Sequence, residues 1–181
     1  MDRSLLALLL PGLLAGVGAS CAPRAAPAAT PASAPGGASA KLDPALESLA
    51  FYVGSWRCRG TEYDAGQAAK TWDARVEVRP ELDGKWLSVQ MIGPGSNRTA
   101  EHKGYDAAHQ RWVHLAVVNN GSWGMGTSKG WEGSSMTFLD PEDPSAITTF
   151  TKINERTYSH GVAEKTDQGP RKVWEKTCSK E

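Results

Sequence analysis

The stretch GSWRCRG, residues 54–60, places a cysteine in the middle of a segment that is typical of a β-strand. The chain contains two other cysteines, Cys21 near its start and Cys178 three residues before its end. The question for each cysteine is whether it is lipidated, bonded to another cysteine or free. The answers bear on the localisation of the protein and on how its β region closes.

The first twenty residues, MDRSLLALLLPGLLAGVGAS, are typical of a secretory signal peptide. Arg3 supplies a positive charge, the segment from Leu5 to Val17 is almost entirely apolar, and small residues follow it. This apolar segment is too short to span a bilayer as a stable helix. We therefore predict a signal peptide over residues 1–20.

Cys21 follows the signal peptide directly. Gly18-Ala19-Ser20-Cys21 resembles the bacterial lipobox, whose cysteine receives acyl chains such as palmitate and becomes the new N-terminus. Residues 21–40 are rich in Ala and Pro and have almost nothing to bury, so we expect a disordered tether. Ala22 after the cysteine implies, by resemblance to Gram-negative lipoproteins, a periplasm-facing place on the outer membrane of the cell envelope. A secreted protein with a spare cysteine is the alternative.

Cys58 and Cys178 then remain as an even pair in an oxidising compartment, where a disulfide is the expected state. No CxxC motif or Cys–His spacing favours a metal site. A catalytic thiol would need protection from oxidation in the periplasm. We predict that the two residues form a disulfide.

Residues 41–181 are predicted to form one domain. A helix is expected from Pro44 to about Tyr52, because Asp43 can cap it and proline suits its first position. The rest alternates between short strands and turn signals, as the segment TWDARVEV shows. About ten strands are expected, near residues 53–63, 70–79, 85–92, 99–106, 111–118, 121–128, 131–139, 146–154, 156–166 and 171–178.

Short strands joined by tight turns favour an all-β fold, an antiparallel up-and-down β-barrel of about ten strands, over a sandwich. In a closed barrel with an even number of strands, the first and last strands are antiparallel neighbours. Cys58 lies in the first strand and Cys178 near the end of the last, so their disulfide would join the two strands. An open sandwich predicts no such proximity.

Three motifs in order carry a family resemblance. The helix followed by Gly54-Ser55-Trp56 resembles the GxW opening of lipocalins and the wider calycin group, which includes fatty-acid-binding proteins and nitrobindins. FYVGSWRCRG, LDGKWL and HKGYD together resemble an uncharacterised bacterial lipocalin-like lipoprotein family, over residues 45–178. The resemblance implies that Gly54 and Trp56 form the barrel base beneath the helix, and that the barrel holds a small hydrophobic ligand.

The segment RTYSHGVA offers candidate ligand-binding residues. Arg156, Tyr158 and His160 share one face of a strand, and an inward Arg and Tyr would suit a carboxylate. The alternative is that this face is solvated and the small residues pack inward. On the last strand, an inward Cys178 would bring Lys176 towards the interior. Strict alternation does not place every residue of this strand comfortably, which leaves a bulge as an open alternative.

The sequence carries few signals for nucleic-acid binding, catalysis or metal binding. The chain has 20 Lys and Arg against 20 Asp and Glu and no basic run, which argues against nucleic acid as a partner. It has no GxSxG elbow, phosphate loop or metal-ligand spacing, so we predict no enzyme activity, no catalytic residues and no metal or cofactor.

The favoured prediction is an envelope lipoprotein, anchored in the membrane by its lipid, whose barrel binds a small, partly apolar ligand. An envelope structural domain without a ligand is the first alternative. The second is haem binding, because nitrobindins hold haem through a late-strand histidine and His160 occupies a comparable place.

Overall fold

The computed structural model describes residues 41–63 and 68–181. The predicted signal peptide, Cys21 and the tether lie outside the described residues. No helix in the described ranges is long and apolar enough to cross a membrane.

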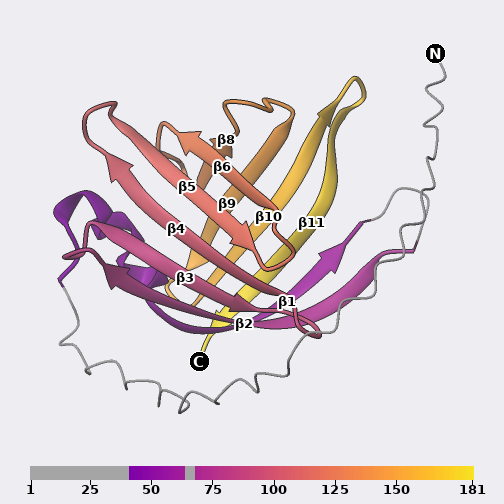
Figure 1. Cartoon of the computed structure of the whole chain (residues 1–181), viewed down its shortest axis with the longest axis horizontal. Helices are drawn as coiled ribbons and strands as arrows, with labels where there is room; N and C mark the ends of the chain where they lie inside the picture. The colour runs from indigo at the N-terminus through magenta and orange to yellow at the C-terminus, as the bar shows by residue number, and fades with distance from the viewer. Residues whose placement is uncertain (1–40, 64–67) are drawn as a thin grey trace, which may run out of the picture. The chain divides into compact units, whose positions relative to one another are not determined.

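Ten strands close an antiparallel barrel, which confirms the predicted fold (Figure 1). Each strand pairs with its neighbour in sequence from β1 to β6 and from β8 to β11; β1 pairs with β11, and β6 meets β8. The very short strand β7 pairs only with β8 and lies outside the ring. The strands are β1 (Gly54–Glu62), β2 (Lys70–Glu81), β3 (Trp86–Ile92), β4 (Arg98–Asp106), β5 (Arg111–Val118), β6 (Trp123–Ser128), β7 (Trp131–Glu132), β8 (Ser135–Leu139), β9 (Ala146–Asn154), β10 (Thr157–Thr166) and β11 (Gly169–Lys180).

Nine of the ten expected strands match a strand of the structure to within two residues at either end. The expected strand over 131–139 is instead divided into β7 and β8. Gly133 lies between them at φ 61°, a left-handed conformation that turns the chain back on itself. This small hairpin leaves β6 and β8 joined through a single residue pair, Thr127 with Leu139.

The predicted helix is present as the 3₁₀ helix η1, Pro44–Tyr52. Asp43 caps it by accepting a hydrogen bond from the backbone N–H of Ala45 at 2.9 Å. The helix ends where Val53 becomes extended and leads into β1. Leu46, Leu49 and Tyr52 are buried and join the core of the barrel, so η1 plugs one end of it.

Trp56 lies fully buried beneath η1, and its indole N–H donates to the carbonyl oxygen of Tyr52 at 2.9 Å. Tyr158 meets both Tyr52 and Trp56 edge to face, at ring separations of 4.9 and 4.8 Å. Gly54 has φ 127°, and a Cβ at this position would lie 3.2 Å from Cε of Lys180.

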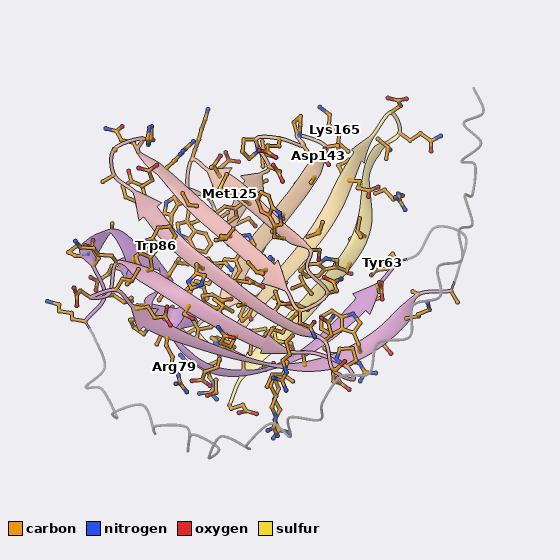
Figure 2. The ribbon with its side chains drawn as sticks, in the orientation of Figure 1. Tyr63, Arg79, Trp86, Met125, Asp143 and Lys165 are labelled. Atoms are coloured by element: carbon orange, nitrogen blue, oxygen red, sulfur yellow. A yellow bond between two sulfur atoms is a disulfide. The ribbon has the colours of Figure 1, made fainter. Side chains whose placement is uncertain are left out.

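Charged side chains such as Arg79 and Lys165 point outward from the barrel (Figure 2).

The first and last strands run side by side through seven residue pairs, and Cys58 lies directly opposite Cys178. Their sulfur atoms are bonded, which confirms the predicted disulfide. Both cysteines are buried and face the interior, so the inner face of β11 also carries Lys176 inward, two residues before Cys178. The pairing of β10 with β11 shifts by one residue at Val173, so the last strand does contain a bulge, and Lys172 beyond it is exposed.

Replacing both Cys58 and Cys178 with Ala, in the full chain carrying Cys21→Ser, is expected to lower the free energy of unfolding. The bridge spans 120 residues, so its loss should cost up to about 4–5 kcal/mol. Urea denaturation of the double variant and its parent measures the difference. Two reactive thiols in the unfolded, unreduced parent would contradict the pairing.

Candidate functional site

A cavity of about 410 Å³ lies in the part of the barrel away from η1. Strand β1 starts beside η1, and successive strands alternate in direction, so β3, β5 and β8 all end at the opposite, open end. Residues at those strand ends, including Gly93, Val118 and Asp140, line the cavity. The walls are largely apolar and aromatic, with Met91, Phe138, Val162 and Trp174 among them.

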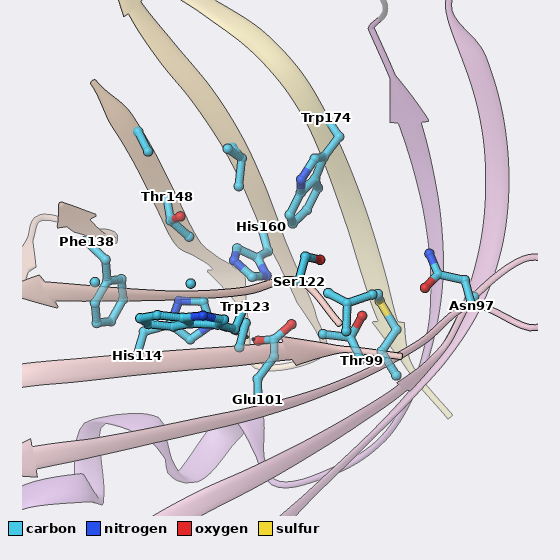
Figure 3. A pocket seen from close by; sticks show the side chains of 18 of the residues that line it. Asn97, Thr99, Glu101, His114, Ser122, Trp123, Phe138, Thr148, His160 and Trp174 are labelled. Carbon is cyan, nitrogen blue, oxygen red and sulfur yellow. Dashed lines mark hydrogen bonds and ion pairs between the residues drawn. The ribbon is translucent and has the colours of Figure 1, made fainter. Parts of the chain in front are cut away.

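Three buried polar side chains converge on the inner part of this cavity (Figure 3). They are Glu101 of β4, His114 of β5 and His160 of β10, and each offers a ligand atom within 4.8 Å of the other two. Two ammonium groups lie against them: Lys103 of β4 and Lys176 of β11, each 1 % exposed. These five residues are called the buried polar cluster below.

The strand register explains why these residues meet. Glu101 and Lys103 are two residues apart on β4, so both side chains point into the barrel. Lys103 pairs across the ladder with His114, and His160 pairs with Lys176. The cluster therefore unites β4 with β5 on one side of the cavity and β10 with β11 on the other.

Glu101 is the acceptor at the centre of the cluster. Its Oε2 accepts hydrogen bonds from Lys103 Nζ at 2.7 Å and from His114 Nε2 at 3.2 Å, and its Oε1 lies 3.8 Å from Lys176 Nζ. Burial acts to raise the pKa of Glu101, but the two neighbouring ammonium groups outweigh it and hold the pKa well below its usual range. Glu101 is therefore ionised and can only accept hydrogen bonds.

Both imidazoles of the cluster are neutral. Burial lowers the pKa of His114, and Lys103 lowers it further; burial also holds the pKa of His160 well below its usual range. Because His114 donates through Nε2 to an ionised carboxylate, its Nδ1 carries a free lone pair.

His160 has no hydrogen-bond partner among the described residues, although it is 2 % exposed and both of its ring nitrogens are buried. A neutral imidazole has one donor and one acceptor, and leaving either unmade in a protein interior costs about 1–3 kcal/mol. The ring lies in the cavity wall and meets Trp174 edge to face at 5.1 Å. His160 is thus a buried polar residue that lines the cavity and lacks a hydrogen-bond partner among the described residues.

Glu101, His114 and His160 are donor types that suit a transition metal. The carboxylate is already occupied by two donors, however, and two ammonium groups adjoin it. A divalent cation would add a third positive centre to a buried site, so the charges favour an uncharged or anionic occupant.

The structure separates the three ligand-binding candidates of the sequence. His160 lines the cavity. Tyr158, two residues earlier on β10, lies in the aromatic core, and its hydroxyl is 3.8 Å from Cys58 Sγ. Arg156 lies in the exposed turn before β10, where its guanidinium donates to the backbone carbonyl of Lys180 at 3.1 Å. Because β10 begins at Thr157, the alternation that relates Tyr158 to His160 does not extend back to Arg156.

Comparison with known proteins supports the barrel fold but assigns no family or function to the chain. No family model and no curated protein match the chain. The crystal structure of Rv2717c from M. tuberculosis is similar, with a TM-score of 0.59 and 12% sequence identity, over 78% of this chain and 99% of that one. At this identity the likeness shows that the two chains share a barrel architecture.

The buried polar cluster predicts how stability depends on pH. The pKa values of His114, His160 and Glu101 are all lowered in the folded state, so the unfolded state binds more protons as the pH falls. The free energy of unfolding is expected to decrease below about pH 6.5, by at most about 1.4 kcal/mol per pH unit for each proton, with Glu101 adding to the loss at more acid pH.

Urea denaturation between pH 4 and pH 8 measures this slope. His160→Phe should flatten the part near pH 6.5, because the variant lacks an imidazole that takes up a proton on unfolding. A slope unaffected by His160→Phe would show that this imidazole is not held neutral in the folded protein.

Proposed function

We propose that this chain binds a small, partly apolar molecule inside the barrel and performs no chemistry on it. The observation that carries the proposal is His160, whose two ring nitrogens lie unpartnered in the wall of an otherwise largely apolar cavity. The cavity of about 410 Å³ falls within the range typical of small-molecule sites. Apolar walls give such a site its affinity, and a few placed polar groups give it orientation.

The alternative of an envelope domain without a ligand has less support. A purely structural barrel would fill its interior with side chains, as the half beneath η1 does with Tyr52, Trp56 and Tyr158. The other half encloses open volume beside a buried imidazole that has no partner, an arrangement that weakens a barrel unless something occupies it.

Haem is the second candidate, favoured by the same free imidazole. His160 is the group that could serve as an axial ligand, and haem when bound would supply redox and gas-binding chemistry. The rim fits haem less well. Glu62 and Asp140 are among the residues that line the cavity, and none of the described lining residues is a lysine or arginine that would pair with the propionates.

We further propose that the barrel is held at the membrane by a lipid on Cys21, as a lipoprotein of the bacterial envelope. The support is the lipobox-like Gly18-Ala19-Ser20-Cys21 after an apolar leader and before an Ala/Pro-rich segment. A tether of this kind would let the barrel take up its ligand near a lipid surface. Several acyl chains on one residue anchor far more firmly than one.

Cavity binding is tested with Nile red, an uncharged apolar probe whose fluorescence rises in apolar sites. Ala116 lines the cavity, so Ala116→Phe should fill space there and weaken binding by at least about tenfold. Its neighbour Leu115 lies on the opposite face of β5, and Leu115→Phe should leave affinity unchanged. Equal affinity in both variants would place the probe outside the barrel. A Soret band in protein purified from its own host would favour haem instead.

Membrane attachment is tested by Cys21→Ser, which removes the sulfur that would carry the lipid. The variant is expected to leave the membrane fraction, while Cys58→Ala together with Cys178→Ala keeps the protein there. Fractionation and immunoblotting measure the distribution. Unchanged retention of the Cys21→Ser protein would contradict lipid anchoring at this residue.

A further inference from the structure

Lys176 is the least satisfied charge of the buried polar cluster. Its ammonium has two near neighbours among acceptors in the described residues: the thioether sulfur of Met91 at 3.2 Å and Glu101 Oε1 at 3.8 Å. A thioether is a weak acceptor, and the carboxylate oxygen lies beyond hydrogen-bond distance. An ammonium has three donors, so Lys176 is buried with most of its hydrogen-bonding capacity unused.

A count of charges points the same way. Glu101 contributes one negative charge, and its Oε2 is already engaged by Lys103 at 2.7 Å and by His114. With both imidazoles neutral, the Glu101–Lys103 pair balances itself, and the ammonium of Lys176 is the remaining positive charge, whose pKa burial lowers. The Glu101 carboxylate at 3.8 Å and the Trp174 ring, 5.6 Å from the ammonium, compensate this buried charge only in part. An anion next to it would reduce the remaining penalty.

Access to Lys176 runs through the cavity. Lys176 is not among the residues that line the cavity, but its neighbours Met91, Glu101 and His160 all line it. Met91 is unbranched and flexible, so its thioether can move aside from the ammonium. A ligand oxygen reaching the inner part of the cavity would meet the His160 ring, and Lys176 lies beside that residue on the paired strand.

We propose that the ligand is a carboxylic acid with an apolar body, bound with its carboxylate towards His160 and Lys176. This inference rests on the proposed function and names its ligand class. His160 donates its ring N–H to one carboxylate oxygen, and the charge of Lys176 balances the anion. The apolar body extends past Phe138 and Trp174 towards the mouth. The acidic Glu62 and Asp140 among the lining residues disfavour the opposite orientation.

The test compares two probes of equal length, decanoic acid and 1-decanol, by calorimetric titration at pH 7 into the full chain carrying Cys21→Ser. Decanoate is expected to bind at least about tenfold more tightly than decanol. Lys176→Met removes the charge at nearly constant volume. It should weaken decanoate binding by at least about tenfold and change decanol binding by less than about threefold. The matched control is Lys165→Met, at an exposed position in β10, which should change neither affinity.

Equal binding of the two probes to the parent chain would overturn the inference whether or not Lys176→Met folds. So would an unchanged preference for decanoate in a folded Lys176→Met protein. If neither probe binds, the acid class is also refuted. The Nile red titration with Ala116→Phe then decides separately whether the cavity binds apolar molecules at all.

Discussion

The pairing of β1 with β11 is the constraint on which the rest of the structure depends. These two strands come from opposite ends of the domain, and only their antiparallel contact turns a meander into a closed ring. The disulfide between Cys58 and Cys178 holds the contact covalently. Closure gives β11 a fixed inner face. That face places Lys176 beside His160 of β10 and opposite Glu101 of β4.

The interior of the barrel is filled by side chains beneath η1 but holds a cavity towards the opposite end. The cavity end is the candidate functional half. Beneath η1, the rings of Tyr52, Trp56 and Tyr158 interlock, and the Tyr52 hydroxyl is buried among them without a hydrogen-bond partner in the described residues. Towards the other end the interior holds buried charges, neutral imidazoles and open volume. The single residue pair between β6 and β8 joins the ring on the cavity side, where Gly126 and Phe138 both line the open volume.

Much of the fold could be predicted because period-2 alternation, turn signals and cysteines at both ends of the β region agreed with one another. The division of 131–139 into β7 and β8 could not, since it depends on one left-handed glycine within an unbroken strand pattern. The site was harder to predict. Alternation left both faces open for His160 and turned Lys176 inward only if Cys178 faced the interior. Glu101 and Lys103 look like a solvated face in sequence, and only the register of β4 with β5 shows that both are buried. Arg156 was grouped with His160 because alternation does not reveal where a strand begins.

The central claim is that a closed barrel leaves space in front of an unpartnered His160. A crystal structure of the protein purified from its own host, without delipidation, tests this most directly. The account predicts a ring closed by β1 and β11, with electron density in the cavity and one of its polar atoms within hydrogen-bond distance of a His160 ring nitrogen. A cavity filled by side chains, with both ring nitrogens bonded to the protein itself, would contradict it.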